Sequence, residues 1–200
     1  MYILADVIKS LQKMFFGILA VLVGISLIVS SAFCAQGASA STYTSNFRNI
    51  PAVNKLPPRV ARWKFTPTVI ICEHAPVSKD QVNSAVKFWK ELGHRFYRTQ
   101  YKYDPQNKCL EKQPTGYIIV HMVTQGLDLE SAALAETRFF VDNDTNKIEW
   151  ATIYMRSDIK ETVLEHEIGH ALGYLHYNKI NHLMNSKWTQ GGWDKDGLKN

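Results

Sequence analysis

Three histidines and a glutamate stand at spacings that suit a bound metal ion. They lie in the run His166-Glu167-Ile168-Gly169-His170-Ala171-Leu172-Gly173-Tyr174-Leu175-His176. On a helix, His166 and His170 lie one turn apart on the same face, so both imidazoles can reach one metal. Glycine tolerates the left-handed backbone of a sharp turn, so Gly173 can end the helix and bring His176 back as a third ligand.

The ligand count and the carboxylate predict the chemistry. Three protein ligands leave a fourth zinc position for water, which is typical of a catalytic rather than a structural zinc. Glu167 directly follows the first ligand and is placed to take a proton from that water. We therefore expect one catalytic Zn²⁺ with Glu167 as general base. The alternative, a helix with three packed or solvated histidines, is disfavoured because five positions match the motif at once.

A methionine follows the third histidine after a short gap. Met184 comes eight residues after His176, in Asn181-His182-Leu183-Met184-Asn185. The long zinc motif followed by a methionine turn resembles the metzincin metallopeptidases, and the short gap is most similar to the matrixin branch. In that family the methionine lies under the zinc as an apolar floor, and the resemblance implies this supporting role for Met184.

The resemblance also implies a fold and a substrate. The fold would be α+β and sandwich-like, of the metzincin-type zincin class: a twisted mixed sheet, two long helices and a short C-terminal subdomain. An extended peptide would pair with the edge strand of the sheet, which would make the protein an endopeptidase. The stretch beginning Leu134-Ala135 resembles that edge. An ordinary sheet strand is the alternative for this stretch.

Several residues depart from the matrixin pattern. Tyr177 stands where matrixins usually have serine, and Asn185-Ser186 stands where they often have an aromatic residue and a proline. The branch and the cleavage preference therefore stay open. Only sixteen residues follow Met184, which leaves little room for the usual C-terminal helix. Trp188 and Trp193 would close this region instead, or pack as ordinary aromatics.

The first forty residues have the pattern of an export signal. Lys9 and Lys13 precede an uncharged apolar run over 14–33, and Ala38-Ser39-Ala40 forms an A-x-A cleavage site. About twenty apolar residues can also span a bilayer, so an uncleaved membrane anchor is the alternative. We expect 1–40 to be a signal peptide or anchor, 41–61 a linker or short pro-arm, and 62–200 the catalytic domain. The domain would be secreted or periplasmic, or anchored with the catalytic part outside.

Composition and cysteine usage agree with an exported enzyme. Hydrophobic residues make up 46% of the chain, which is enough for a core. The formal charge is +5, but the basic residues do not form a cluster with interleaved aromatic residues. Nucleic-acid binding is therefore not expected, and we expect a monomer acting on a protein or peptide. Beyond Cys34 in the leader, Cys72 and Cys109 remain, which suggests one disulfide in an oxidising compartment. Two unpaired cysteines are the alternative.

Hydrophobic periodicity predicts the elements that must position the zinc motif. The predicted strands cover 68–72, 96–103, 117–123, 134–141 and 147–155, and His121 in the third is expected to be structural. Ser78 and Gln81 predict a capping box for a helix whose apolar spacing continues to Phe96. Ser157 is expected to cap the zinc helix, with Asp158 and Glu161 in its first turn. The turn at 142–146 could suit Ca²⁺, but Asn and Asp favour turns on their own account, so calcium is not supported.

Three functions fit these residues. The first is an exported zinc endopeptidase. The second is a zinc hydrolase of cell-wall or other non-protein amides, since the zinc chemistry alone does not distinguish between amides. The third is a zinc-bound recognition module with little activity. The intact Glu167 argues against the third, because a binding module needs no base beside the metal.

Overall fold

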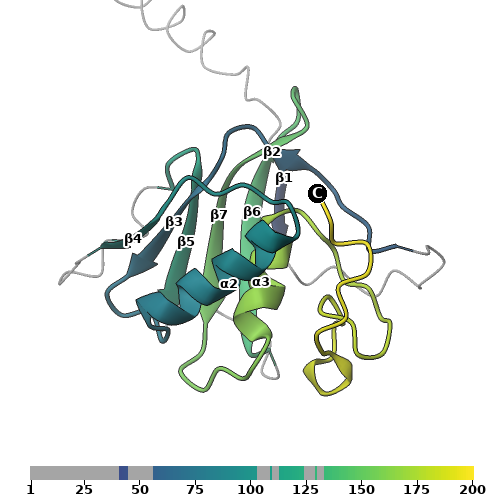
Figure 1. Ribbon diagram of the computed structural model, residues 1–200. Helices are drawn as coiled ribbons and strands as arrows, with labels where there is room; N and C mark the ends of the chain where they lie inside the picture. The colour runs from purple at the N-terminus through teal and green to yellow at the C-terminus, as the bar shows by residue number, and fades with distance from the viewer. Residues whose placement is uncertain (1–40, 45–55, 103–108, 110–112, 124–128, 130–132) are drawn as a thin grey trace, which may run out of the picture. The chain divides into compact units, whose positions relative to one another are not determined.

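The computed structural model describes residues 41–44, 56–102, 109, 113–123, 129 and 133–200 (Figure 1). The predicted leader at 1–40, including Cys34, lies outside the described residues, as does 45–55 of the predicted linker. Within the described ranges, no helix is both long and apolar enough to cross a membrane.

The described residues contain seven strands in one mixed sheet (Figure 1). Its order is β1-β6-β7-β5-β3-β4, and β2 pairs with β7. β4, β3, β5 and β7 run parallel, whereas β6 is antiparallel to β7 and β1 is antiparallel to β6. The strands are β1 (Ser41–Thr44), β2 (Arg62–Trp63), β3 (Thr68–Cys72), β4 (Thr99–Lys102), β5 (Tyr117–Met122), β6 (Ala135–Asp142) and β7 (Lys147–Met155).

Most predicted strands are confirmed to within a residue, but the start of one strand differs, and β1 and β2 were not predicted. β4 begins at Thr99 rather than at residue 96, and β1 forms within the segment predicted as a linker. Phe96 is buried in the core from the connection before β4, where it packs without belonging to a strand. The prediction that Phe96 is a core residue is therefore confirmed, but its placement at the start of a strand is wrong.

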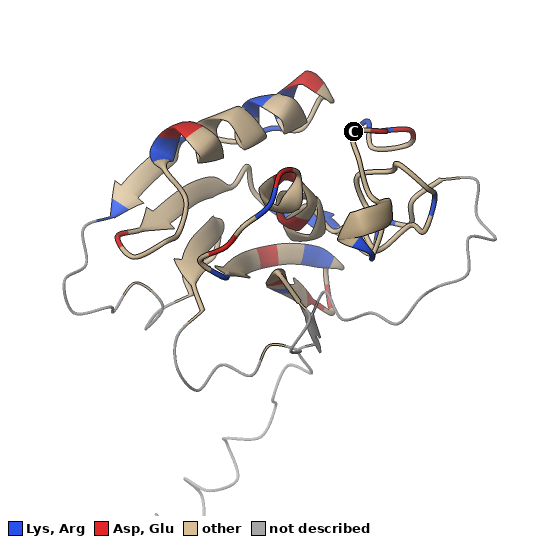
Figure 2. Ribbon diagram, turned by 90° about the horizontal axis from the view of Figure 1, so that it is seen from below, with Lys and Arg blue, Asp and Glu red and all other residues tan. Residues whose placement is uncertain are grey.

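Helix α2 (Lys79–Glu91) begins where the sequence predicts. The Ser78 hydroxyl accepts from the Gln81 N–H at 3.2 Å, and the Gln81 carbonyl oxygen Oε1 accepts from the Ser78 N–H at 2.8 Å. The helix ends before Phe96, because Gly93 adopts a left-handed φ of 91° and turns the chain away. Its exposed face carries both acidic and basic residues (Figure 2): Lys79, Asp80, Lys87, Lys90 and Glu91.

Helix α3 (Val163–Ala171) begins later than predicted, and the cap predicted at Ser157 is wrong. The residue before the helix is Thr162, in a left-handed conformation and without a side-chain cap. Tertiary contacts hold Glu161 outside the helix. Its backbone carbonyl accepts from Trp188 Nε1 at 2.9 Å, and its carboxylate accepts from Trp193 Nε1 at 3.1 Å. The two tryptophans thus join the C-terminal region to the start of α3.

The two helices cover the same face of the sheet, and the main core lies between them (Figure 1). Trp89 of α2 is fully buried there, and its Nε1 donates to the Glu165 carbonyl of α3 at 2.9 Å. This arrangement, a mixed and mostly parallel sheet with two helices, is compatible with the predicted α+β fold. α3 has only nine residues, so it is not the long helix that the sequence suggested.

The other face of the sheet carries the predicted disulfide. Cys72 in β3 and Cys109 are bonded, with Cα atoms 5.9 Å apart, and both pack against Ile119 of β5. His121 is fully buried in β5, and its Nδ1 contacts the Met122 carbonyl. This agrees with the structural role predicted for His121.

Removing the disulfide should destabilise the fold. The bond closes a separation of 37 residues, and restricting the unfolded chain in this way stabilises by about 3–4 kcal/mol. We expect the double variant Cys72→Ala, Cys109→Ala to lose that free energy of unfolding, measured with urea. Wild-type protein in a reducing agent serves as the control and should lose a similar amount. Equal stability of the variant and the oxidised wild type would contradict this account.

Candidate metal centre

The centre begins with the reversal at the end of α3. Gly173 has a φ of 93°, and a Cβ built on it would lie 2.3 Å from the Ala61 carbonyl oxygen. The Gly173 carbonyl in turn accepts from the Val60 N–H at 2.8 Å. Only glycine combines this left-handed backbone with so close a neighbouring strand segment. The reversal returns the chain over Tyr174 and Leu175 to His176.

The reversal brings the three predicted ligands together. One ligand atom from each of His166, His170 and His176 lies within 4.8 Å of the other two. Zn–N distances of about 2.0–2.1 Å in a tetrahedral site place nitrogens about 3.3 Å apart, so small side-chain adjustments suffice. The His166 and His170 Nε2 atoms already lie 2.9 Å apart. No other such group of three occurs in the described part of the chain.

Backbone carbonyls set the tautomers of two of these histidines. The Nδ1 atom of His166 lies 2.6 Å from the Leu183 carbonyl, and that of His170 lies 2.7 Å from the Tyr174 carbonyl. A carbonyl oxygen can only accept, so each Nδ1 carries the proton and each Nε2 offers a lone pair. Both lone pairs then face the same point, as metal binding requires.

Burial keeps these imidazoles neutral. It lowers the pKa of His166 to about 4, with a further lowering by His176. It lowers the pKa of His170 well below its usual range, with further lowering by the other two rings. Neutral imidazole is the form that binds a metal, so at neutral pH no proton has to be displaced from these two ligands.

Glu167 directly follows His166 in α3 and is shielded from solvent. Its side chain is buried, and its Oε2 accepts from the Thr137 hydroxyl of β6 at 2.6 Å. Burial raises the pKa of Glu167 to about 7, although the Thr137 hydrogen bond acts in the opposite direction. A cation at the histidines would lower this pKa again. Burial thus favours the protonated carboxyl group, whereas a bound cation would favour the carboxylate, the form that accepts a proton.

Met184 packs directly under the ligand helix. It is fully buried, and a Cβ at Gly169 would lie only 2.5 Å from its sulfur. Gly169 lies between His166 and His170 in α3, so the missing side chain leaves space for the thioether beneath the two ligands. Its role as the floor of a metal site stays a prediction.

The predicted substrate stretch lies where β6 extends past β1. Leu134 and Ala135 are partly buried and pack on the core. β1 pairs with Arg138–Val141 of β6. Binding of substrate at this stretch stays a prediction.

The acidic turn after β6 is an ordinary polar turn. The Asp142 carboxylate accepts from the Thr145 hydroxyl at 2.9 Å and from the Asp144 N–H at 2.9 Å, and it lies 3.6 Å from the Lys64 ammonium. The first of these contacts contributes most to a lowered pKa of Asp142. These local contacts are those of the polar turn that the sequence predicts.

Thr137 and the two carbonyls were not among the residues predicted for the site. Thr137 reaches Glu167 from a strand 30 positions earlier. It ends the predicted edge stretch Leu134-Ala135-Glu136-Thr137, but nothing in that sequence marks it as a partner of Glu167. The Leu183 carbonyl belongs to the methionine-turn segment that the sequence singled out, but a backbone acceptor has no sequence signature.

Two glycine substitutions distinguish the clash of a side chain with the Ala61 carbonyl from the strain of a left-handed backbone alone. Gly116 also has a left-handed φ, of 88°, but a Cβ added there would meet no atom within 4 Å. We expect Gly116→Ala to lose about 1–2 kcal/mol of unfolding free energy. Gly173→Ala should lose about 3 kcal/mol or more and bind zinc more weakly, because the clash at Ala61 displaces the turn to His176. Urea unfolding and zinc titration measure both effects, and equal losses in the two variants would refute the close-approach argument.

No model of a known protein family matches the chain, and no curated protein matches it either.

Proposed function

We propose that the protein is an exported zinc-dependent endopeptidase with a metzincin-type fold, most like the matrixin branch. The observation that carries this proposal is the convergence of three imidazoles, two of them oriented by backbone carbonyls, beside a buried carboxyl group. The antiparallel β6 next to β7 and the two helices on one face are compatible with that fold. The methionine below the ligand helix also supports the proposal.

Each residue of the centre has a chemical task. His166, His170 and His176 would hold the zinc ion, and Glu167 would move the proton. When bound, the zinc would lower the pKa of a coordinated water and polarise the substrate carbonyl. Glu167 would accept the proton of the attacking water and later return it to the leaving amine.

Thr137 orients the proton carrier. Its hydroxyl contacts Glu167 at two points: Oε2 at 2.6 Å and the backbone carbonyl at 3.1 Å. These contacts hold the carboxylate in one orientation. Thr137 also belongs to the Ala135–Thr137 stretch of β6, so one strand would both pair with the substrate and orient the carboxylate. A site that pairs with extended backbone favours cleavage inside a chain rather than at its ends.

Export is supported by two independent features. The N-terminal sequence has the charge, apolar run and cleavage site of an export signal. The Cys72–Cys109 disulfide persists best in an oxidising compartment. We propose a secreted or periplasmic enzyme, or one anchored by an uncleaved leader.

Glutamine at position 167 tests the mechanism. Glu167→Gln keeps the size of the side chain but removes the base, so we expect one zinc per chain and a fall in kcat of about 10²- to 10⁴-fold or more. The measurement is cleavage of a mixed peptide library, with zinc content determined in parallel. Glu165→Gln, a change of the same chemistry on the same helix, is the matched control and should keep full activity.

The same library distinguishes between the candidate functions. Internal cleavage that a hydroxamate chelator abolishes would support the endopeptidase. Zinc binding without peptide cleavage would favour a hydrolase of other amides. Unchanged turnover in Glu167→Gln would show that this carboxylate is not the base.

A further inference from the structure

We propose that Lys179, through its ion pairs with Asp194 and Asp196, positions the metal centre from outside it. The proposal rests on the proposed metal binding and adds to it. These residues hold the backbone segment whose carbonyl orients His166. Lys179 is therefore a positioning residue, and the C-terminal segment at 194–196 is the element that it holds in place.

The chain after His176 forms a loop closed by its own hydrogen bonds. The Tyr177 N–H donates to the Met184 carbonyl at 2.7 Å. The Asn185 side-chain amide donates to the Lys179 carbonyl at 2.9 Å. This loop presents Leu183 and Met184, both buried, to the underside of α3.

Leu183 connects the C-terminal segment to a metal ligand. Its N–H donates to the Asp194 carbonyl at 2.8 Å, and its own carbonyl accepts from His166 Nδ1 at 2.6 Å. A displacement of Asp194 would therefore move the acceptor that sets the tautomer and direction of the His166 ring. Outer contacts of this kind commonly tune metal affinity by 10- to 100-fold.

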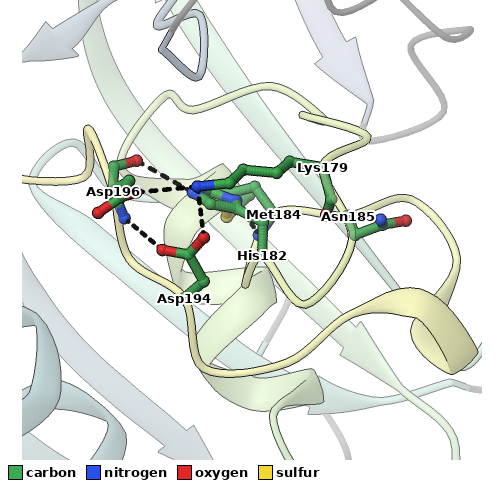
Figure 3. Close-up of polar contacts among 6 residues, drawn as sticks. All are labelled: Lys179, His182, Met184, Asn185, Asp194 and Asp196. Atoms are coloured by element: carbon green, nitrogen blue, oxygen red, sulfur yellow. Dashed lines mark hydrogen bonds and ion pairs between the residues drawn. The ribbon is translucent and has the colours of Figure 1, made fainter.

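His182 makes a second connection between the same two segments. Its ring is fully buried, accepts from the Met184 N–H through Nδ1 at 3.0 Å, and donates through Nε2 to the Asp196 carbonyl at 3.0 Å. The ring is therefore neutral, with its proton on Nε2. His182 holds the methionine turn against the C-terminal segment (Figure 3).

The ammonium of Lys179 completes this network. Figure 3 shows it between two carboxylates, 2.7 Å from Asp194 Oδ2 and 2.8 Å from Asp196 Oδ2. Without the ammonium, the two neighbouring carboxylates would repel each other and tend to separate. Their separation would pull on the two backbone carbonyls that hold Leu183 and His182.

Loss of the Lys179 charge should disturb the structure around His166 without unfolding the protein. The Lys179 side chain is 42% exposed, and exposed ion pairs contribute little to overall stability. Between Met184 and Asn200 the only helix is the three-residue η1 (Trp188–Gln190). The position of this segment therefore depends largely on side-chain contacts. Loss of the lysine charge should thus disturb the His166 acceptor while the core remains folded.

Lysine-to-methionine variants of the full-length chain test the proposal. In Lys179→Met we expect zinc affinity to fall by about 10- to 100-fold in chelator competition. The visible absorption bands of the Co²⁺-substituted protein should shift. In the metal-free protein, the hydrogen-bonded Nδ1 proton of His166 should exchange faster with water by NMR. The melting temperature of the metal-free protein should change by less than about 2 °C.

Two further variants serve as controls. Lys187→Met removes an exposed lysine of the same region that makes no ion pair with the described residues, and it should change none of these readouts. Lys179→Arg keeps a cation between the carboxylates and should restore the wild-type values. If Lys179→Met fails to fold, Asp196→Asn removes one ion pair only and should show the same changes more weakly.

The outcomes separate this inference from the proposed function. If Lys179→Met matches Lys187→Met in affinity, spectrum and proton exchange, the positioning role is wrong while the zinc site stands. A wild-type protein that binds no zinc would overturn both.

Discussion

The proposed metal centre depends on two hydrogen bonds from imidazole N–H groups to backbone carbonyls. His166 donates to Leu183, and His170 donates to Tyr174. Neither carbonyl lies on the ligand helix itself, so the helix alone cannot orient its two imidazoles. The ring directions are set by the chain that follows α3, and this makes the reversal at Gly173 and the returning loop as necessary as the histidines.

The rest of the fold converges on the two acceptor residues. Leu183 is held from the C-terminal side by Asp194. Tyr174 stacks on Trp89 of α2, with ring centroids 5.7 Å apart, and its hydroxyl donates to the Leu198 carbonyl at 3.1 Å. The core between helices and sheet therefore supports one acceptor, and the C-terminal segment supports both. The C-terminal segment, which has almost no helix of its own, thus helps to orient the His166 and His170 rings.

Local signals predicted well, and tertiary contacts account for what they missed. The spacing of the three histidines and Gly173 is local, so a cluster of three imidazoles could be predicted from sequence, and the structure brings these side chains together. The same holds for the apolar runs of β3 and β7 and for the capping box of α2. The start of α3 could not be predicted, because tryptophans from beyond the methionine turn hold Glu161 outside the helix. The contact between Thr137 and Glu167 depends on how β6 packs on α3, which no local pattern encodes.

X-ray absorption at the zinc edge, on protein loaded with one equivalent of zinc, tests the central claim most directly. The account predicts four nitrogen or oxygen ligands at about 2.0–2.1 Å, with the scattering pattern of three imidazoles. His176→Ala should show two imidazoles under the same conditions. Sulfur scattering at about 2.3 Å, or an unchanged imidazole count in His176→Ala, would contradict a catalytic zinc held by His166, His170 and His176.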